Sequence, residues 1–190
     1  MCKSYKAWLK VLCFNYLKIS LVQQRPLDIT QPLALPDQLK TYKTPVSALV
    51  LIYTPDLKVL IMERADKAGY WQSVTGSIEG DETPLQAAAR ELAEETGLDA
   101  TQYALEDWHV SNVYEIYPHW RHRYAPGVTE NREHLFGLML PGPLPVRLAP
   151  DEHLRYEWVD WREAAKRVFS WTNVDALKRL GERYQLTLEN

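Results

Sequence analysis

Three glutamates, Glu91, Glu94 and Glu95, have the spacing in this chain that most clearly suggests chemistry. On an α-helix, positions i, i+3 and i+4 fall within an arc of about 100°. Like charges so placed repel one another, and the C-terminal part of a helix, where they would lie, further disfavours negative charge. A divalent cation would offset both effects by taking the carboxylates as shared ligands. Taken alone, the helix is equally consistent with an acidic face exposed to solvent.

The helix that carries these glutamates is predicted over Pro84–Thr96. Thr83 is a suitable N-cap, Gln86 can complete a capping box with it, and Gly97 is the residue type that commonly ends a helix. Five residues at helical spacing are expected to bury against a sheet: Leu85, Ala88, Ala89, Leu92 and Thr96. The glutamates are expected on another side of the helix.

Further elements are predicted from apolar runs and turn residues. The strands are Val46–Tyr53 and Lys58–Met62 as a hairpin, Trp71–Thr75, Asn112–Tyr117, Glu133–Leu140 and Arg155–Val159, and the later helices are Trp161–Val168 and Asn173–Tyr184. Strands mixed with a few helices predict an α+β fold in which helices pack on the faces of a sheet.

A longer motif surrounds the glutamates. Residues 76–98 fit the pattern G-x5-E-x7-R-E-U-x-E-E-x-G-U, in which U is aliphatic, at every position. This is the signature of the Nudix hydrolases, and the chain resembles that family. The resemblance implies a Nudix fold, with a mixed β-sheet sandwiched between α-helices, and Mg²⁺-dependent cleavage of a diphosphate linkage.

The resemblance also implies roles for the residues of the motif, which are Gly76, Glu82, Arg90, Glu91, Glu94 and Glu95. The three helix glutamates become metal ligands, with one of them as a candidate base, and the Gly76 carbonyl is a further candidate ligand. Arg90 and Glu82 resemble the residues that hold the glutamates in place. Glu152 matches a distal ligand or base, although a surface acid is its alternative reading. Ligands that are all oxygens favour Mg²⁺, with Mn²⁺ as an alternative, over zinc.

Several stretches outside the motif bear on the substrate. They are YKTPVSALVLIY from Tyr42, WQSVTGS from Trp71, RHRYAPGVT from Arg121, DEHLRYEW from Asp151 and SWTN from Ser170. They resemble one Nudix family in particular, the bacterial dihydroneopterin triphosphate diphosphatases. The resemblance implies hydrolysis of dihydroneopterin triphosphate to its monophosphate and pyrophosphate, a step in folate biosynthesis. The implied substrate-site residues are Lys43, Arg64, Thr75, Tyr114, Glu115, Ile116, Tyr117 and Ser170.

Two further observations concern this predicted substrate site. The basic run at 119–123 offers Arg121 and Arg123 as phosphate contacts, because arginine binds phosphate in a bidentate manner. A solvated loop with surface ion pairs is the alternative. In a regular strand, alternation would place Tyr114 and Tyr117 on opposite faces, so that only one of them faces the pocket.

The composition of the chain bears on which kinds of molecule it binds. The chain has 190 residues and a formal net charge of −3, which gives no general attraction to nucleic acid or to an anionic membrane. Its two cysteines, Cys2 and Cys13, exclude a disulfide framework, and no uncharged apolar run reaches the roughly 18 residues of a membrane span. We expect a cytoplasmic enzyme with a small-molecule triphosphate substrate; the oligomeric state is not indicated.

Residues 41–190 are predicted to form the Nudix domain. Residues 1–40 are interpreted as a weakly ordered extension or as the result of a start codon assigned too early; a signal peptide or a membrane-touching helix are alternatives. Two functional alternatives stay open. One is a pyrophosphohydrolase of nucleoside triphosphates such as dATP, and the other is a Nudix-fold sensor without catalysis.

Overall fold

The computed structural model describes residues 42–188, so the predicted N-terminal extension lies outside the described residues. Seven strands are present: β1 (Val46–Tyr53), β2 (Lys58–Arg64), β3 (Trp71–Gln72), β4 (Val74–Ser77), β5 (Leu105–Glu115), β6 (Glu130–Met139) and β7 (His153–Asp160). The helices are α1 (Pro84–Thr96), α2 (Trp161–Arg167) and α3 (Trp171–Arg183), with short 3₁₀ segments η1 (Ala100–Gln102) and η2 (Pro118–Arg123). The predicted α+β class is confirmed, and each predicted helix is found within two residues of its expected bounds.

The strands form one mixed sheet in the order β3-β2-β1-β6-β5, with β4 paired to β1 and β7 paired to β2. β1 and β6 are parallel, and the other pairs are antiparallel. The predicted hairpin of β1 and β2 is paired only at Tyr53 and Val59. Beyond that point β1 pairs with β4 instead, from Ser47 to Val50. The separation of β1 from β2 leaves room for a cavity at this end of the sheet.

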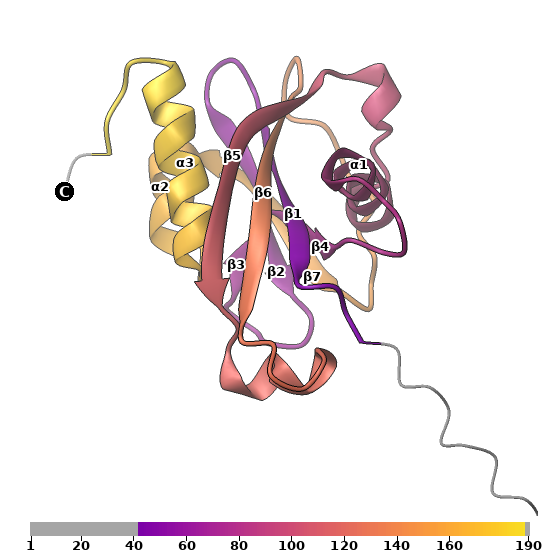
Figure 1. Ribbon diagram of the computed structural model, residues 1–190. Helices are drawn as coiled ribbons and strands as arrows, with labels where there is room; N and C mark the ends of the chain where they lie inside the picture. Colours follow the sequence, from indigo (N-terminus) through magenta and orange to yellow (C-terminus); the bar gives the residue numbers. More distant parts are fainter. Residues whose placement is uncertain (1–41, 189–190) are drawn as a thin grey trace, which may run out of the picture. The chain divides into compact units, whose positions relative to one another are not determined.

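β1 explains why the sheet needs cover on both faces. Its alternate residues belong to two different cores: Ala48, Val50 and Ile52 pack on the side of α1, whereas Leu49 and Leu51 pack on the side of α2 and α3. Figure 1 shows α1 on one side of the sheet and α2 and α3 on the other. A strand buried on both faces carries a continuous apolar run, as β1 does.

The ends of α1 are as predicted, but its buried face is not. Thr83 and Gln86 form the reciprocal capping box, and Gly97 ends the helix in the left-handed region at φ 71°. The expected stripe is wrong at Leu85, which is 46% exposed, because the helix is rotated so that Glu91 and Glu95 face inward toward the sheet. The three glutamates therefore do not share one solvent-exposed face.

Two strand predictions also need correction. The predicted strand Trp71–Thr75 is divided at Ser73 into β3 and β4, which pair with different neighbours. β5 begins at Leu105, seven residues before the predicted start at Asn112, because an irregularity at 107–110 lets it continue along β6. None of the helices in the described range has the length and apolarity that a membrane span needs.

Candidate active site

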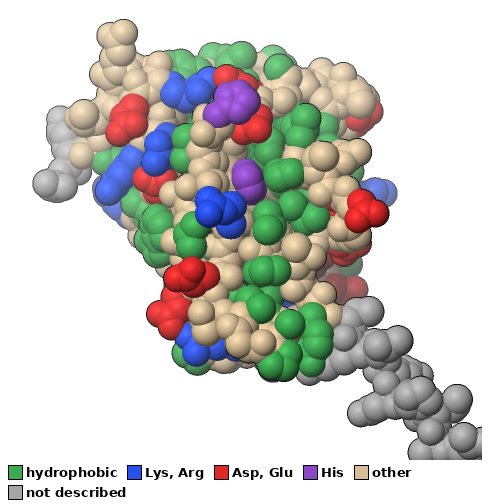
Figure 2. Space-filling model, viewed as in Figure 1, with side chains coloured by type: hydrophobic (Ala, Val, Ile, Leu, Met, Phe, Trp, Pro, Cys, Tyr) green, Lys and Arg blue, Asp and Glu red, His purple; other side chains and the backbone are tan. Residues whose placement is uncertain are grey.

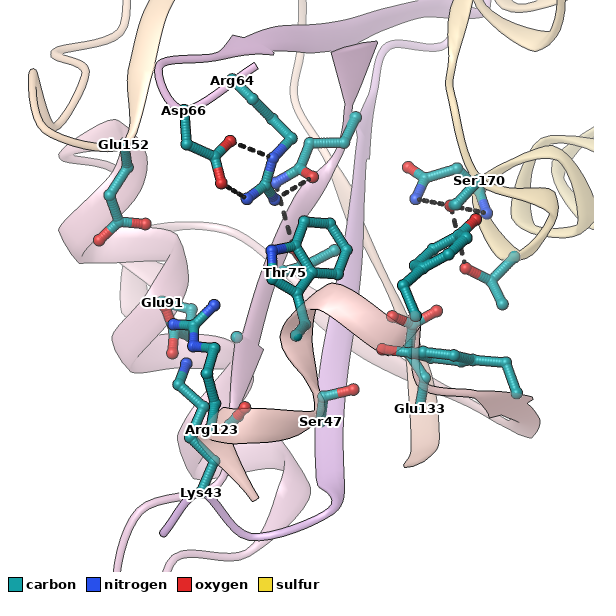
Figure 3. Close-up of a pocket in the computed structure, with 18 of the residues that line it drawn as sticks. Lys43, Ser47, Arg64, Asp66, Thr75, Glu91, Arg123, Glu133, Glu152 and Ser170 are labelled. Carbon is teal, nitrogen blue, oxygen red and sulfur yellow. Dashed lines mark hydrogen bonds and ion pairs between the residues drawn. The ribbon is translucent and has the colours of Figure 1, made fainter. Parts of the chain in front are cut away.

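A cavity of about 610 Å³ lies where β1 and β2 separate. β1, β2, β4, β5 and β6 contribute to its walls, together with α1, the loop before β7 and the first turn of α3. Figure 3 shows two ends: Glu91 and Glu152 lie at one, and Glu133 and Ser170 at the other. Outside the cavity, on the face drawn in Figure 2, acidic and basic side chains are interspersed.

Burial is the main property of the carboxylates at the first end. Glu91 is 9% exposed, and burial raises its pKa to about 7. Glu95 is fully buried, and burial together with the charge of Glu152 raises its pKa. Oxygens of Glu95 and Glu152 and a nitrogen of His153 lie within 4.8 Å of one another. Such desolvated carboxylates need a cation nearby to stay charged.

Arg90 holds the glutamates of α1 and the loop before it. Its guanidinium binds Glu82 through Nε at 2.8 Å and Nη2 at 3.0 Å. Nη1 donates to Glu91 at 2.8 Å and to Glu94 at 3.0 Å, and Nη2 also donates to the Ser77 carbonyl at 3.0 Å. One side chain thus restrains three carboxylates, those of Glu82, Glu91 and Glu94.

Besides Arg90, which is occupied by the carboxylates, the cationic side chains that line the cavity are Lys43, Arg64 and Arg123. Desolvation and the nearby charge of Arg123 lower the pKa of Lys43. Arg64 is fixed by two hydrogen bonds to Asp66, at 2.7 and 2.6 Å, and its guanidinium carbon lies 5.0 Å from the centre of the Trp120 ring. These positive groups can contact the negative charges of a bound phosphate chain.

The two arginines that were predicted as phosphate contacts have different surroundings in the structure. Arg123 lines the cavity, whereas Arg121 does not. Arg121 donates instead to the Ile116 carbonyl at 3.1 Å and forms a short ion pair with Glu115. Arg121 is therefore a support for the loop that carries Arg123, since its guanidinium is already occupied.

The expected alternation of Tyr114 and Tyr117 does not hold, and both side chains line the cavity. β5 ends at Glu115, and Tyr117 is the N-cap residue just before η2, so the two-residue period of a strand no longer applies. Ile116 is 2% exposed and lies outside the cavity lining, which corrects its place among the substrate contacts. Thr75, Glu115 and Ser170 do line it.

Aromatic rings enclose this part of the cavity. The centres of the Tyr117 and Trp120 rings are 5.5 Å apart, and those of Trp120 and Phe169 are 6.5 Å apart, both in edge-to-face orientation. Trp171, at the start of α3, also lines the cavity and is exposed. Ring faces of this kind can hold a flat heterocycle.

Comparison with known proteins identifies the family. The model of the NUDIX domain matches residues 43–180, which is more than half of the chain. The chain belongs to the Nudix family. Because the match includes the sheet, α1 and most of α3, the Nudix fold expected from the sequence is confirmed.

Two of the curated relatives match over most of their length. The dihydroneopterin triphosphate diphosphatase of Escherichia coli (strain K12) is 48% identical over 143 residues, which is 74% of this chain and 94% of the relative. The protein of the same name from Haemophilus influenzae is 43% identical over 142 residues, covering 73% and 88%. The solved structure of the E. coli dihydroneopterin triphosphate pyrophosphohydrolase has a TM-score of 0.69 and 46% identity, covering 74% of this chain and 97% of the other.

The side chains at the first end of the Nudix cavity fit a hard divalent cation. Glu91, Glu94 and Glu152 line the cavity, and Glu95 lies buried beside Glu152. Gly76 adds a position without a side chain, where an added Cβ would lie 1.7 Å from the Glu91 Cδ atom. The set is dominated by oxygen donors and buried negative charge, as Mg²⁺ and Mn²⁺ sites are.

Sequence reasoning missed two buried residues of this Nudix site. His153 Nε2 lies 2.8 Å from Glu95 Oε2 and so orients that carboxylate. Glu133, on β6, lines the other end of the cavity. His153 directly follows the candidate ligand Glu152 in the sequence, and this position could have marked it as a residue of the site. Glu133 was expected only as the first residue of a strand, and nothing local distinguishes it from a solvent-facing acid.

Proposed function

We propose that this Nudix hydrolase is a cytoplasmic enzyme that hydrolyses dihydroneopterin triphosphate to dihydroneopterin monophosphate and pyrophosphate, a reaction of folate biosynthesis, with Mg²⁺ as its cation. The observation that carries the proposal is the division of one cavity into a carboxylate and cation end and an aromatic end. A substrate with a charged chain and a flat ring matches both. Identity of 48% over 94% of a relative with this activity supports the same substrate.

At the phosphate end, the positive side chains would bind the triphosphate and the glutamates would hold the cation. Glu91, Glu94, Glu95 and Glu152 are the proposed ligands, together with the Gly76 carbonyl; Mn²⁺ would suit the same oxygens. When bound, the cation supplies charge neutralisation at the phosphates and makes water a better nucleophile. Lys43, Arg64 and Arg123, which line the cavity, would offset the charge that remains, since a triphosphate carries about four negative charges.

The chain's own contribution to bond cleavage is orientation and proton removal. Water would attack the α-phosphorus, and pyrophosphate would leave. One of the glutamates removes the proton of the water, a step that typically contributes about 10²- to 10⁴-fold. Arg90 and His153 keep the carboxylates in place through the contacts described above. Misplacement of such a group by about 1 Å can itself cost about 10²-fold in rate.

At the other end, the ring of the substrate would lie among Tyr114, Tyr117, Trp120 and Ser170. Stacking alone cannot strongly exclude a purine of similar area. Nucleoside triphosphates such as dATP are therefore the second candidate substrates, and the same cavity would accept them with the same chemistry.

Mass-spectrometric product analysis over a panel of triphosphates tests the proposal. With Mg²⁺ present, dihydroneopterin triphosphate should yield equal amounts of monophosphate and pyrophosphate, with a higher kcat/KM than dATP or GTP. Stepwise release of single orthophosphates would refute the reaction. A higher kcat/KM for a nucleotide would favour the second candidate, and metal-dependent binding without turnover would indicate a sensor.

A further inference from the structure

Glu133 is a buried acid at the end of the cavity away from the glutamates of α1. It lies on β6, where it pairs with Ser47 of β1 and with Asn112 of β5. The residue is 6% exposed and lines the cavity. Figure 3 shows it on the side of Ser170 and across the cavity from Glu91 and Glu152. Glu133 therefore lies at the aromatic end of the cavity (the ring end), apart from the proposed cation.

One oxygen of this carboxyl, Oε2, has no hydrogen-bond partner among the residues that the structure describes. Buried polar side-chain atoms are nearly always satisfied, so an unsatisfied acceptor in a cavity wall calls for a ligand. Burial raises the pKa of Glu133 to about 7, and only the Thr172 hydroxyl opposes this shift. No ion pair within residues 42–188 includes Glu133, which distinguishes it from a structural salt bridge.

The neighbouring donors are already engaged with other partners. The Asn131 side-chain amide donates to Ser47 Oγ at 2.7 Å, and the Tyr114 hydroxyl hydrogen-bonds with these same two side chains. On α3, the Asn173 amide donates to Ser170 Oγ at 2.8 Å. The nearby donors are thus engaged elsewhere, and two buried acceptors, Asn131 Oδ1 and Glu133 Oε2, have no hydrogen-bond partner among the described residues. A bound molecule with N–H groups would supply the missing donors.

The chemistry of a carboxylate defines what that molecule must present. An ionised carboxyl has two acceptor oxygens and no donor, and it binds most strongly to two adjacent N–H groups. The pterin ring offers such a pair, a ring N–H next to an exocyclic amino group, and guanine offers the same pair. Adenine differs, because its amino group stands next to an acceptor nitrogen.

We propose that Glu133 is the specificity-determining residue for the base, accepting hydrogen bonds from the adjacent ring N–H and amino group of a pterin. This inference rests on the proposed function. Stacking on the aromatic side chains does not select among flat rings of similar area. Hydrogen bonds from the ring edge to Glu133 would supply that selection. The residue touches the base and not the reacting phosphates, so its role is selection of the substrate.

The substitution Glu133→Gln tests the proposal because it keeps the shape and replaces one acceptor by a donor. The glutamine amide has one acceptor and one donor, so it cannot accept from both N–H groups of a pterin or a guanine. It does match the donor and acceptor pair of adenine. We expect kcat/KM to fall by roughly 10- to 100-fold for dihydroneopterin triphosphate and for GTP, and to stay level or rise for dATP. Glu130→Gln, at the exposed start of the same strand, is the matched control and should leave all three values unchanged.

Binding of dihydroneopterin, which carries no phosphate, gives an independent measurement by titration calorimetry without metal. Its affinity should fall by a similar factor in the Glu133→Gln protein, with a melting temperature no lower than that of the wild type. Equal losses for all three triphosphates, or no loss for any, would overturn the proposal, since they would indicate a packing role or none.

A comparison of substrates on the wild-type protein requires no folded variant. Inosine triphosphate lacks the amino group of GTP, and we expect its kcat/KM to be at least about 10-fold lower than that of GTP. Equal values would overturn the assignment of Glu133. If the wild type fails to release pyrophosphate from dihydroneopterin triphosphate, the proposed function fails, whereas the comparison of GTP, inosine triphosphate and dATP still decides the role of Glu133.

Discussion

Replacing Gly76 by alanine would put a methyl group where the Glu91 side chain now lies. The added Cβ would be 1.7 Å from Cδ, 1.8 Å from Oε1 and 2.3 Å from Cγ of Glu91. Nonbonded carbon atoms stay about 3.5–4.0 Å apart, so the carboxylate must move by roughly 2 Å. The displacement would also break its 2.8 Å contact with Arg90.

Stability and activity should respond differently to this change. The Glu91 side chain can rotate away at a cost of about 0.5–1.5 kcal/mol, which corresponds to a fall in melting temperature of less than about 6 °C. Catalysis depends on the position of the Glu91 carboxylate, and a misplacement of about 1 Å can lower the rate by about 10²-fold. We therefore expect kcat to fall by at least about 10²-fold in a protein that stays folded.

The assay is pyrophosphate release from dihydroneopterin triphosphate at saturating Mg²⁺, with a thermal melt of each protein. Gly142→Ala is the matched control, because no atom lies within 4 Å of its added Cβ. It should change neither quantity. Wild-type kcat in the Gly76→Ala protein would refute the reasoning, since the carboxylate would then be dispensable at the position where the structure places it.

Three further predictions follow from the same site. Arg123→Ala should raise KM for the triphosphate by roughly 10- to 100-fold, whereas Arg121→Ala should raise it much less; equal effects would contradict the assignment of Arg123 alone to the cavity. Glu95→Gln should weaken Mn²⁺ binding, measured by titration calorimetry, by at least about 10-fold, and unchanged affinity would exclude Glu95 as a ligand. Burial raises the folded-state pKa of Glu133 from 4.5 to about 7, so the folded protein binds this proton more tightly and the free energy of unfolding decreases as the pH rises through that range. Melting temperature plotted against pH should be flatter for Glu133→Gln than for the wild type between about pH 5 and 8, and parallel curves would contradict this.

Local signals in the sequence were sufficient to predict α1 and the family motif that it carries. Its cap at Thr83 and its end at Gly97 depend on hydrogen bonds within a few residues, which is the range that a sequence pattern describes. The rotation of the helix was not predictable from periodicity, because Glu91 and Glu95 face inward against the usual preference of charged residues for solvent.

The parts of the site that depend on pairing between distant strands were outside the reach of sequence reasoning. His153 reaches Glu95, 58 residues away, only because β7 pairs with β2 so that Arg64 and His153 stand in register. Likewise, Tyr117 faces the cavity only because β5 ends two residues earlier.

The sequence by itself determined the family, the glutamates of α1 and the chemistry of their oxygens, since these follow from residue type and short-range spacing. Only the tertiary structure decided which acids are buried, which arginine lines the cavity, and that Glu133 meets the ring end with an unsatisfied oxygen. The physical reason is that burial and hydrogen-bond satisfaction are set by neighbours brought together by the whole sheet, and no short segment contains that information.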